Sequence, residues 1–403
     1  MSKALDLVVI GGGAAGFFAA INYAEKHPNK QVTILEASNK FLQKVKVSGG
    51  GRCNVTHFCF EPKELTAYYP RGTKELLGPF HYFQPGDTIA WFAERGVDLV
   101  PEEDGRMFPS ANTSEAIIAL FMERVNALGI RLLPQTKVEK LVQGEEGWEL
   151  DCGQNGSFVA KNTLLATGGT TSFYQVLERV GVNMISPSPS LFSFHFKDRN
   201  WMEGLAGNTL QEIGVAVDLK GFKMEEFGPV VFTHKGMSGP GVLKLSAWGA
   251  SHFKALNYSF PISLNFIPST SLEQFESHFA HLQGESILKF GQFDIPKRTW
   301  EALMVKTGFD QVKASEIRGK TAKAMYDSLS KFAVQVEGKS ANKEEFVTAG
   351  GIDLKEVNFK TMELKRFPGL FAAGELLNID GLTGGFNFQA AWTGAFIAAE
   401  NMH

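Results

Sequence analysis

Three glycines near the start of the chain have the spacing of a phosphate-binding turn. They are Gly11, Gly13 and Gly16, and Glu36 follows 20 residues after the last of them. In such a turn the first glycine permits the sharp reversal and the second lets the backbone approach a pyrophosphate. The third lets a helix pack closely on a sheet, and the acid accepts hydrogen bonds from ribose hydroxyls. The spacing therefore predicts a dinucleotide site.

The segments around these glycines have the pattern that such a site requires. Residues 5–10 form an apolar run, residues 17–26 are a small-residue helical segment, and residues 32–35 form a second apolar run. This order predicts a strand, a turn, a helix and a strand. The helix N-terminus, with the backbone of Ala14 and Ala15, would offer free N–H groups and a positive dipole to phosphate.

The glycine turn alone does not distinguish NAD from FAD, and the C-terminal sequence favours FAD. Residues 369–375 read as an apolar strand that ends in Gly374-Glu375, and residues 380–389 are glycine-rich and precede a small-residue helix. We expect Glu375 to accept a hydrogen bond from a ribityl hydroxyl. The N-terminus of the final helix would direct its dipole at the flavin pyrimidine edge, where negative charge builds on reduction.

Composition indicates an ordinary globular protein. The chain has 403 residues, 44% of them hydrophobic and 21% charged, and a formal net charge of −3. This balance gives no general attraction to nucleic acid or anionic membrane. The three cysteines are too few for a disulfide framework and suit a reducing compartment. No secretory signal or run of 18 apolar residues is apparent, so we expect a cytoplasmic protein without a membrane span.

The order of segments predicts one α/β nucleotide-binding domain that is split by a long insertion. The pattern changes near Pro187-Ser188-Pro189, becomes strand-like, and turns helical from Thr270 to about Leu329. Asn112, followed by Glu115, predicts a capped helix start, and residues 163–167 predict a buried strand. The expected segments are the first part of the FAD-binding domain (1–188), an inserted β domain (189–268), a small helical domain (269–330), the rest of the β domain (331–345) and the second part of the FAD-binding domain (346–403).

Several longer motifs carry a family resemblance. They are Val8–Ala20, Ser48–Thr56, Gly105–Pro109, Phe232–Pro240, Thr348–Gly351 and Gly374–Gln389. In these motifs the chain resembles the bacterial FAD-binding flavoprotein family that includes aminoacetone oxidase and the flavin reductases of bile-acid 7-dehydroxylation. The resemblance implies a Rossmann-like FAD-binding domain of the glutathione-reductase type, interrupted by a β-barrel-like domain that itself carries a small helical domain.

Two departures from the family pattern concern the substrate side. After Gly169 the family usually continues with a proline and further glycines before a Gly-His pair, and the corresponding segment here, residues 170–182, is shorter and lacks them. Asn378 stands where the family commonly has Asp. Activity and substrate therefore do not transfer directly from the family.

The predicted cofactor site combines both ends of the chain with the glycine-dense loop at residues 40–54. Backbone N–H groups of Gly49–Gly51 and the side chain of Arg52 suit a pyrophosphate or the flavin carbonyls. The predicted cofactor-binding residues are Gly11, Gly13, Ala14, Ala15, Gly16, Glu36, Ala37, Lys44, Ser48, Gly50, Gly51, Arg52, Cys53, Asn54, Val138, Thr167, Gly168, Gly374, Glu375, Asp380, Gly385, Phe386 and Asn387.

No side chain stands out as a catalytic acid or base, and three weak candidates remain. Cys53 lies beside Arg52, a setting that predicts an exposed thiol of lowered pKa. Arg106 suits either an anionic substrate or the bracing of a turn, and His234 lies next to a glycine-rich turn of the insertion. Cys53 and Cys59 have five intervening residues, one more than the redox pair of disulfide-reductase flavoproteins. No Cys/His cluster has metal-ligand spacing, so no metal is predicted.

We expect an FAD-dependent oxidoreductase with non-covalent FAD. It would transfer hydride between a reduced donor, either NAD(P)H or an amine-like substrate, and an organic acceptor or oxygen. We expect a small-molecule substrate and no nucleic-acid or membrane partner, and the oligomeric state is open. Three alternatives remain: a disulfide reductase that uses Cys53 and Cys59, an RNA-modifying flavoenzyme, and a non-catalytic binding protein with this fold.

Overall fold

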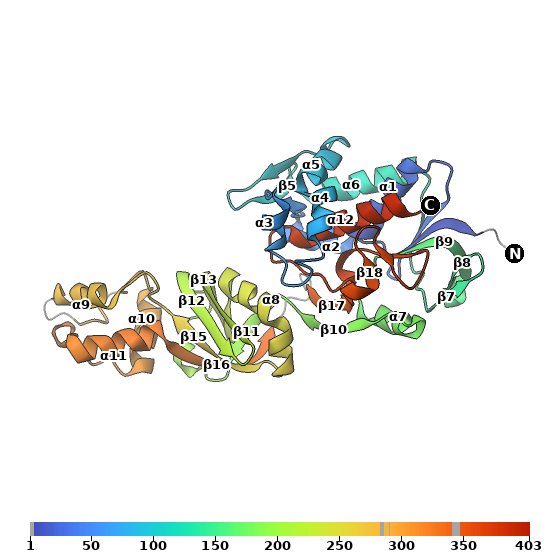
Figure 1. Ribbon diagram of the computed structural model, residues 1–403. Coiled ribbons are helices and arrows are strands. Elements are labelled where there is room, and N and C mark those ends of the chain that lie inside the picture. Colours follow the sequence, from blue (N-terminus) through green and yellow to red (C-terminus); the bar gives the residue numbers. More distant parts are fainter. Residues whose placement is uncertain (1–3, 283–285, 290, 341–346) are drawn as a thin grey trace. The chain divides into compact units, whose positions relative to one another are not determined.

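The computed structural model describes residues 4–282, 286–289, 291–340 and 347–403 (Figure 1). The chain divides into two compact units, Met1–Ser188 with Lys343–His403, and Pro189–Asn342. The C-terminal segment thus returns to the N-terminal unit. The predicted boundary between residues 345 and 346 lies outside the described residues, and the division of the insertion into a β and a helical domain stays a prediction.

The expected Rossmann-type α/β fold is confirmed in the first unit. In spatial order, the sheet contains β18 (Val357–Asn358), β19 (Glu363–Leu364), β20 (Leu370–Ala372), β9 (Ser157–Leu165), β1 (Leu5–Ile10), β2 (Val32–Leu35) and β6 (Arg131–Leu133), and the hairpin of β7 (Lys140–Gly144) and β8 (Gly147–Asp151) joins at β9. β20, β9, β1, β2 and β6 run parallel. The strand expected at residues 163–167 overlaps only the last three residues of the longer β9, which ends at Leu165. The first residues of β9 pair with β8 and its later residues with β1.

Two helices from opposite ends of the chain pack against each other beside this sheet. They are α1 (Ala14–Lys26) and α12 (Phe386–Asn401), which Figure 1 shows side by side. Their contact includes the rings of Phe18 and Trp392, whose centroids lie 5.1 Å apart. The alanine and glycine residues of both helices permit this close approach. Helices from the two ends of the chain therefore pack together in one domain.

Smaller elements cover the rest of the first unit. They are the helices α2 (Gln43–Gly51), α3 (Pro62–Thr66), α4 (Leu77–Tyr82), α5 (Pro85–Ala93), α6 (Glu115–Ala127) and α7 (Tyr174–Val180), the strands β3 (Thr56–His57), β4 (Leu99–Pro101) and β5 (Arg106–Pro109), and the pair β10 (Met184–Pro189) and β17 (Thr348–Ile352). The expected cap at Asn112 is wrong: Ser114 precedes α6, and its hydroxyl donates to the carbonyl of Lys46 instead of capping the helix.

The second unit contains a closed six-stranded barrel. Its strands are, in order, β11 (Ser193–Phe196), β14 (Gly236–Ser238), β13 (Phe222–Thr233), β12 (Thr209–Leu219), β15 (Ser259–Asn265) and β16 (Phe332–Ser340). The helix α8 (Pro240–Ala255) packs on the barrel and places Phe253 flat against Phe260, with ring centroids 4.0 Å apart. The β-barrel-like insertion is therefore present.

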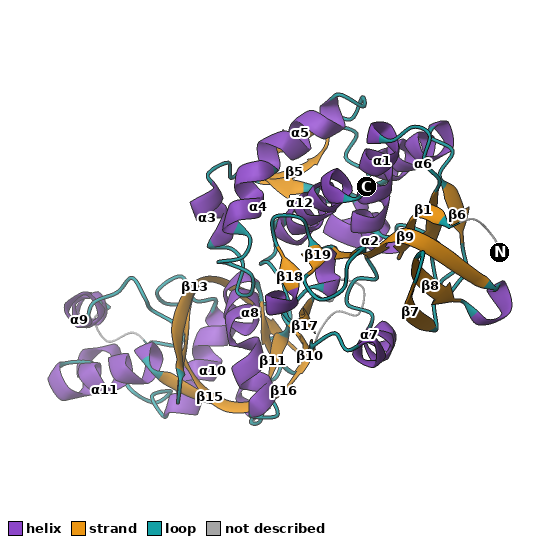
Figure 2. Cartoon of the chain, turned by 45° about the vertical axis from the view of Figure 1, so that its right-hand side comes forward, coloured by secondary structure: helices purple, strands orange, loops and turns teal. Residues whose placement is uncertain are grey.

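Among the described residues between β15 and β16, three α-helices follow before the chain returns to the barrel. They are α9 (Leu272–Ala280), α10 (Lys297–Thr307) and α11 (Gly319–Ser330). Figure 1 shows them at one end of the barrel, and Figure 2 shows the same helices and strands turned by 45°. Their buried side chains, such as Trp300 and Met325, belong to the same hydrophobic cluster as the barrel residues Phe194 and Val215. Among the described residues, no helix has the length and apolarity that crossing a membrane requires.

A buried polar network ties the last helix to distant segments of the first unit. Gln389 on α12 is fully buried, and its Oε1 atom accepts hydrogen bonds from the hydroxyls of Thr56 (2.6 Å) and Thr88 (2.9 Å). Its Nε2 atom donates to Thr393, whose hydroxyl in turn donates to the carbonyl of Phe83. A network with every member paired fixes the position of α12.

Replacing this glutamine by leucine is expected to destabilise the protein. Gln389→Leu removes the acceptor of two buried hydroxyls, each of which costs about 1–3 kcal/mol when unpaired, so the free energy of unfolding should fall by about 2–4 kcal/mol. Equilibrium unfolding in urea measures this change. Gln143→Leu, at an exposed position on β7, is the control and should shift the free energy by less than about 0.5 kcal/mol. Equal stability of both variants would show that the network does not support the fold.

Candidate functional site

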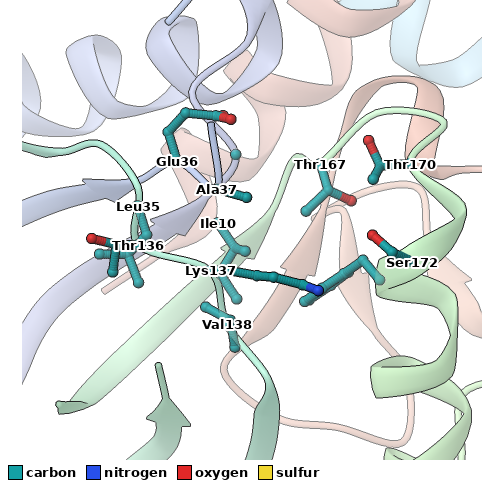
Figure 3. A pocket seen from close by; sticks show the side chains of 12 residues that line it. Ile10, Leu35, Glu36, Ala37, Thr136, Lys137, Val138, Thr167, Thr170 and Ser172 are labelled. Atoms are coloured by element: carbon teal, nitrogen blue, oxygen red, sulfur yellow. The ribbon is translucent and has the colours of Figure 1, made fainter. Parts of the chain in front are cut away.

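A pocket opens at the carboxyl ends of the parallel strands. Ile10 ends β1, Leu35 ends β2, and Thr167 follows β9, which is where open α/β sheets bind ligands. Figure 3 shows Leu35, Ile10 and Val138 along one wall and Thr167, Thr170 and Ser172 along the other. The lining residues are Ile10, Gly11, Leu35, Glu36, Ala37, Thr136, Lys137, Val138, Thr167, Thr170, Ser172 and Phe173.

Glu36 is fixed at the rim of this pocket by backbone hydrogen bonds. One carboxylate oxygen accepts from the N–H of Gly12 and the other from the N–H of Ser38, both at 2.8 Å. A carboxylate oxygen has two acceptor positions, so each oxygen keeps one for a ligand. The side chain is thus already oriented for two adjacent hydroxyls.

The three glycines of the turn differ in the space that surrounds them. Gly11 has φ +113°, and a Cβ atom there would lie 2.3 Å from the carbonyl oxygen of Ala166. A Cβ atom at Gly16 would lie 2.0 Å from the carbonyl oxygen of Gly11. At Gly13, by contrast, a Cβ atom would meet no protein atom within 4 Å, and no side chain caps the N-terminus of α1. The open space at Gly13 lies where the sequence predicts a pyrophosphate.

A second carboxylate, Glu375, lies where three distant segments meet. It accepts a hydrogen bond from the N–H of Thr348 at 2.8 Å and forms an ion pair with Lys44. The Oγ1 atom of Thr348 lies within 2.3 Å of a Cβ atom built at Gly169. The predicted residues Lys44 and Glu375 are therefore neighbours, although more than 300 positions separate them in sequence.

Two hydroxyl groups without partners, those of Tyr174 and Thr348, lie near this carboxylate. The side-chain oxygens of Thr167, Tyr174 and Thr348 are buried and make no hydrogen bond in the described structure. Burial, and the neighbouring charge of Glu375, raise the pKa of Tyr174 to about 12, so its hydroxyl stays protonated. Buried polar groups are rarely left unpaired. A polar ligand such as the ribityl chain of FAD would supply the missing partners, so these residues fit the cofactor.

The Gly49–Gly51 loop lies beside the N-terminus of α12. All three glycines have left-handed φ angles, between +56° and +85°, which interrupt the helical segment α2. With its amide oriented so that both ends are paired, Asn54 accepts from the N–H of Gly385 at 3.0 Å and donates to the carbonyl of Thr56. Like α1, α12 has no side-chain cap. The predicted Asn54 and Gly385 thus meet, and Gly49 of the loop packs against Asn54.

Two cationic side chains near the site are held by protein groups. Arg52 forms an ion pair with Glu102 at 2.6 Å, and its guanidinium carbon lies 3.9 Å from the centre of the Phe108 ring. Arg106 forms ion pairs with Glu102 at 2.8 Å and with Asp104 at 2.7 Å. Of the two roles considered for Arg106, the geometry favours bracing a turn.

Two predicted cofactor contacts, Cys53 and Asp380, have fully buried side chains, and their contact with the cofactor stays a prediction. Asp380 is fully buried in an ion pair with Arg71. Cys53 is also fully buried, and burial raises the pKa of its thiol to about 12, the opposite of the expected lowering by Arg52. Beside Asp380, the Asn387 amide makes two 2.8 Å hydrogen bonds with the backbone of Gly381 and so braces this turn.

The redox pair and the histidine candidate gain no support from the geometry. Cys53 and Cys59 are free thiols, and burial together with the charge of Glu64 raises the pKa of Cys59. His234 is exposed in the turn between β13 and β14 of the second unit. Within the described residues, no group of three or more His, Cys, Asp and Glu side chains is arranged to hold a metal ion.

Several residues at the site were not predicted from the sequence. Lys137 extends its side chain across the pocket (Figure 3), and Tyr174 and Thr348 supply the unpaired hydroxyls. His57 lies next to the Ser48–Thr56 motif, and its Nδ1 atom is 2.9 Å from the carbonyl oxygen of Gly384. The sequence could have indicated His57, because it comes directly after that motif. Lys137, Tyr174 and Thr348 reach the site only through contacts between distant segments.

Both departures from the family pattern have a structural counterpart. The side-chain oxygen of Asn378 accepts from the N–H of Gly350 at 2.9 Å, a contact that an Asp carboxylate would also make. In the short segment after Gly169, Thr170, Ser172 and Phe173 line the pocket at the strand ends. This segment therefore contributes to the predicted adenosine side of the site.

Comparison with known proteins places the chain among flavoenzymes. The chain is 27% identical to the ribosomal RNA dihydrouridine synthase of Escherichia coli (98% of each chain) and 28% identical to that of Haemophilus influenzae (99% and 98%). It is 25% identical to the 3-dehydro-bile acid delta(4,6)-reductase of Clostridium scindens over 97% of each chain. None of these three is an aminoacetone oxidase, so that part of the resemblance stays a prediction.

The fold agrees with a solved flavoenzyme structure. The 3-ketosteroid delta1-dehydrogenase from Sterolibacterium denitrificans, in complex with 1,4-androstadiene-3,17-dione, superposes with a TM-score of 0.54 at 12% identity, over 99% of each chain. The model of the HI0933-like protein Rossmann domain matches residues 5–401. The chain therefore belongs to the HI0933-like protein Rossmann domain family and is an FAD-dependent oxidoreductase.

Proposed function

We propose that the protein reduces a carbon–carbon double bond conjugated with a carbonyl group, with NAD(P)H as donor and non-covalently bound FAD as carrier. Two reactions named in its relatives share this chemistry, since uracil and a 3-oxo-4,6-diene steroid both hold a double bond conjugated with a carbonyl. The single observation that carries the cofactor assignment is the set of unpaired hydroxyls near Glu375. We treat the donor and the acceptor as the parts to be tested.

Each part of the proposed cofactor site has a defined task. Glu36 would hold the ribose hydroxyls of the adenosine, and the uncapped N-terminus of α1 would hold the pyrophosphate. Glu375, with Thr348 and Tyr174, would bind the ribityl hydroxyls. The Gly49–Gly51 loop and the N-terminus of α12 would hold the flavin ring and favour negative charge on its pyrimidine edge. When bound, FAD supplies the hydride transfer, and the protein supplies orientation and exclusion of water.

The environment of Cys53 supports non-covalent binding and argues against a disulfide reductase. The thiolate is the nucleophile in covalent flavin attachment through sulfur and in disulfide exchange. With a pKa of about 12, the thiol of Cys53 is almost entirely protonated at neutral pH. A non-catalytic role is not supported either, because the residues around both carboxylates are arranged for a ligand.

A uracil ring in ribosomal RNA is a second candidate acceptor, favoured by the two relatives that are dihydrouridine synthases. The net charge of −3 is unfavourable for general binding to RNA. A steroid-like enone needs no polyanion contact. The two acceptors therefore differ in the expected effect of salt, because binding to RNA phosphates weakens steeply as salt rises.

The decisive experiment follows reduction and reoxidation of the purified protein without oxygen. We expect a yellow protein whose flavin band is bleached by NADH or NADPH and restored by a 3-oxo-4,6-diene steroid or by uridine-containing ribosomal RNA. Mass spectrometry of the acceptor should show the gain of two hydrogens. A protein that takes up no FAD, or that neither nicotinamide nucleotide reduces, would refute the proposal.

Replacing Gly13 of the glycine turn with a larger residue should abolish FAD binding without unfolding the protein. In Gly13→Val the side chain meets no protein atom but fills the space proposed for the pyrophosphate. We expect at least about a hundredfold weaker FAD binding, measured by flavin fluorescence, because the dinucleotide must leave its contacts at α1. Gly78→Val is the control, since Gly78 on α4 is also open and is exposed. Normal FAD content in Gly13→Val would place the cofactor elsewhere.

The buried thiol should be chemically inert and dispensable. Because the pKa of Cys53 is about 12, only about one thiol in 10⁴ is ionised at pH 8. Iodoacetamide labelling followed by mass spectrometry should modify the partly exposed Cys59 before Cys53, and Cys53→Ser should retain its reduction by the donor. A Cys53–Cys59 disulfide in the oxidised protein, together with inactivity of Cys53→Ser, would instead favour the disulfide-reductase alternative.

A further inference from the structure

Tyr68 presents an aromatic ring beside the N-terminus of the last helix. Its ring lies parallel to that of Phe386, with centroids 4.3 Å apart and an angle of 11° between the planes. Phe386 is the first residue of α12 and is 1% exposed, whereas Tyr68 is 36% exposed. Phe386 therefore covers one face of the Tyr68 ring, and Tyr68 keeps exposed surface beside the stack.

This stack is held in place by its surroundings. The Tyr69 hydroxyl donates to the carbonyl of Phe386 at 2.6 Å, and the N–H of Leu382 donates to the carbonyl of Tyr68 at 2.9 Å. The His57 ring lies 4.5 Å from that of Phe386 and 5.8 Å from that of Tyr68. An aromatic surface that is already rigid loses little conformational freedom when a ligand stacks on it.

A hydrogen bond from His57 connects the stack to the glycine turn. Burial lowers the pKa of His57, so the ring is neutral at pH 7. Its Nδ1 atom faces the carbonyl oxygen of Gly384 at 2.9 Å, and a carbonyl only accepts, so the single ring proton lies on Nδ1. The position of the turn and that of the aromatic stack are therefore coupled.

We propose that Tyr68 determines acceptor specificity by stacking on the flat conjugated ring of the electron acceptor. The inference rests on the proposed function, which places the flavin ring at Gly385–Asn387 and gives the acceptor a planar conjugated segment. Aromatic side chains bind flat rings through their faces with little dependence on ring substituents. Tyr68 would thus act as a specificity residue that contacts the acceptor, and it would contribute nothing to flavin binding.

The test compares Tyr68→Ala with Tyr82→Ala in the FAD-loaded protein. Tyr82 is a matched control because it is 59% exposed, lies on α4 and is not stacked, with its ring tilted by 48° at 6.2 Å from Phe396. The probes are a 3-oxo-4,6-diene steroid and a uridine-containing RNA oligonucleotide. Each is titrated into the oxidised protein, and the change in flavin absorbance gives the dissociation constant.

We expect Tyr68→Ala to bind the effective probe about tenfold more weakly. Tyr68→Phe and Tyr82→Ala should bind it within about threefold of the original protein, because the former keeps the stacking ring and the latter lies outside the proposed site. FAD content and the rate of reduction by the donor should be unchanged in all three variants. A structural role alone would lower these two quantities together with binding.

The outcomes separate this inference from the proposed function. If the original protein binds a probe and Tyr68→Ala binds it equally well, the stacking role is wrong while the proposed acceptor class stands. If the original protein binds neither probe, the acceptor class fails and the stacking role fails with it. If Tyr68→Ala loses FAD, Tyr68→Leu replaces it, because leucine still covers Phe386, and equal binding by that variant would overturn the inference.

Discussion

The parallel pairing of β9 with both β1 and β20 is the constraint on which the site depends. Leu164, near the end of β9, pairs with Val9 on one side and with Phe371 on the other. These strands are buried, and buried backbone groups must stay paired, so β20 cannot slip without losing hydrogen bonds. As a consequence, the turns after β1 and β20 lie at the same sheet edge, where a Cβ atom at Gly374 would lie 3.1 Å from that of Ala15.

Backbone hydrogen bonds orient two carboxylates at this edge. Glu36 is held by the N–H groups of Gly12 and Ser38, and Glu375 by that of Thr348. Arginine side chains contribute less to the site than their number suggests, since Arg52 and Arg71 are both in ion pairs with acidic residues. In the proposed site, recognition of a negatively charged cofactor would therefore depend mainly on the uncapped N-termini of α1 and α12.

The insertion uses the abundant phenylalanine of this chain for packing. Phe192, Phe194, Phe253 and Phe260 form edge-to-face and stacked pairs in the barrel. The same hydrophobic cluster continues into α9, α10 and α11, so the barrel and these helices share one core. Closure of the barrel and coverage by α8 leave this unit without the long exposed sheet edge that an isolated β insertion would present.

The sequence by itself determined the elements whose signals are local. The bounds of β1 and β2, the glycine turn and the acid that follows come from spacing and hydrophobic pattern within 36 residues, because each step depends on near neighbours. The return of the C-terminus and the family motifs were also readable. By contrast, the sequence predicts an exposed thiol of lowered pKa at Cys53 and a cofactor contact at Asp380. In the tertiary structure the Cys53 thiol is buried with a raised pKa, and Asp380 lies in a buried ion pair with Arg71. Burial, unpaired hydroxyls and the stack of Tyr68 on Phe386 depend on contacts across hundreds of residues, so only the folded structure decided them.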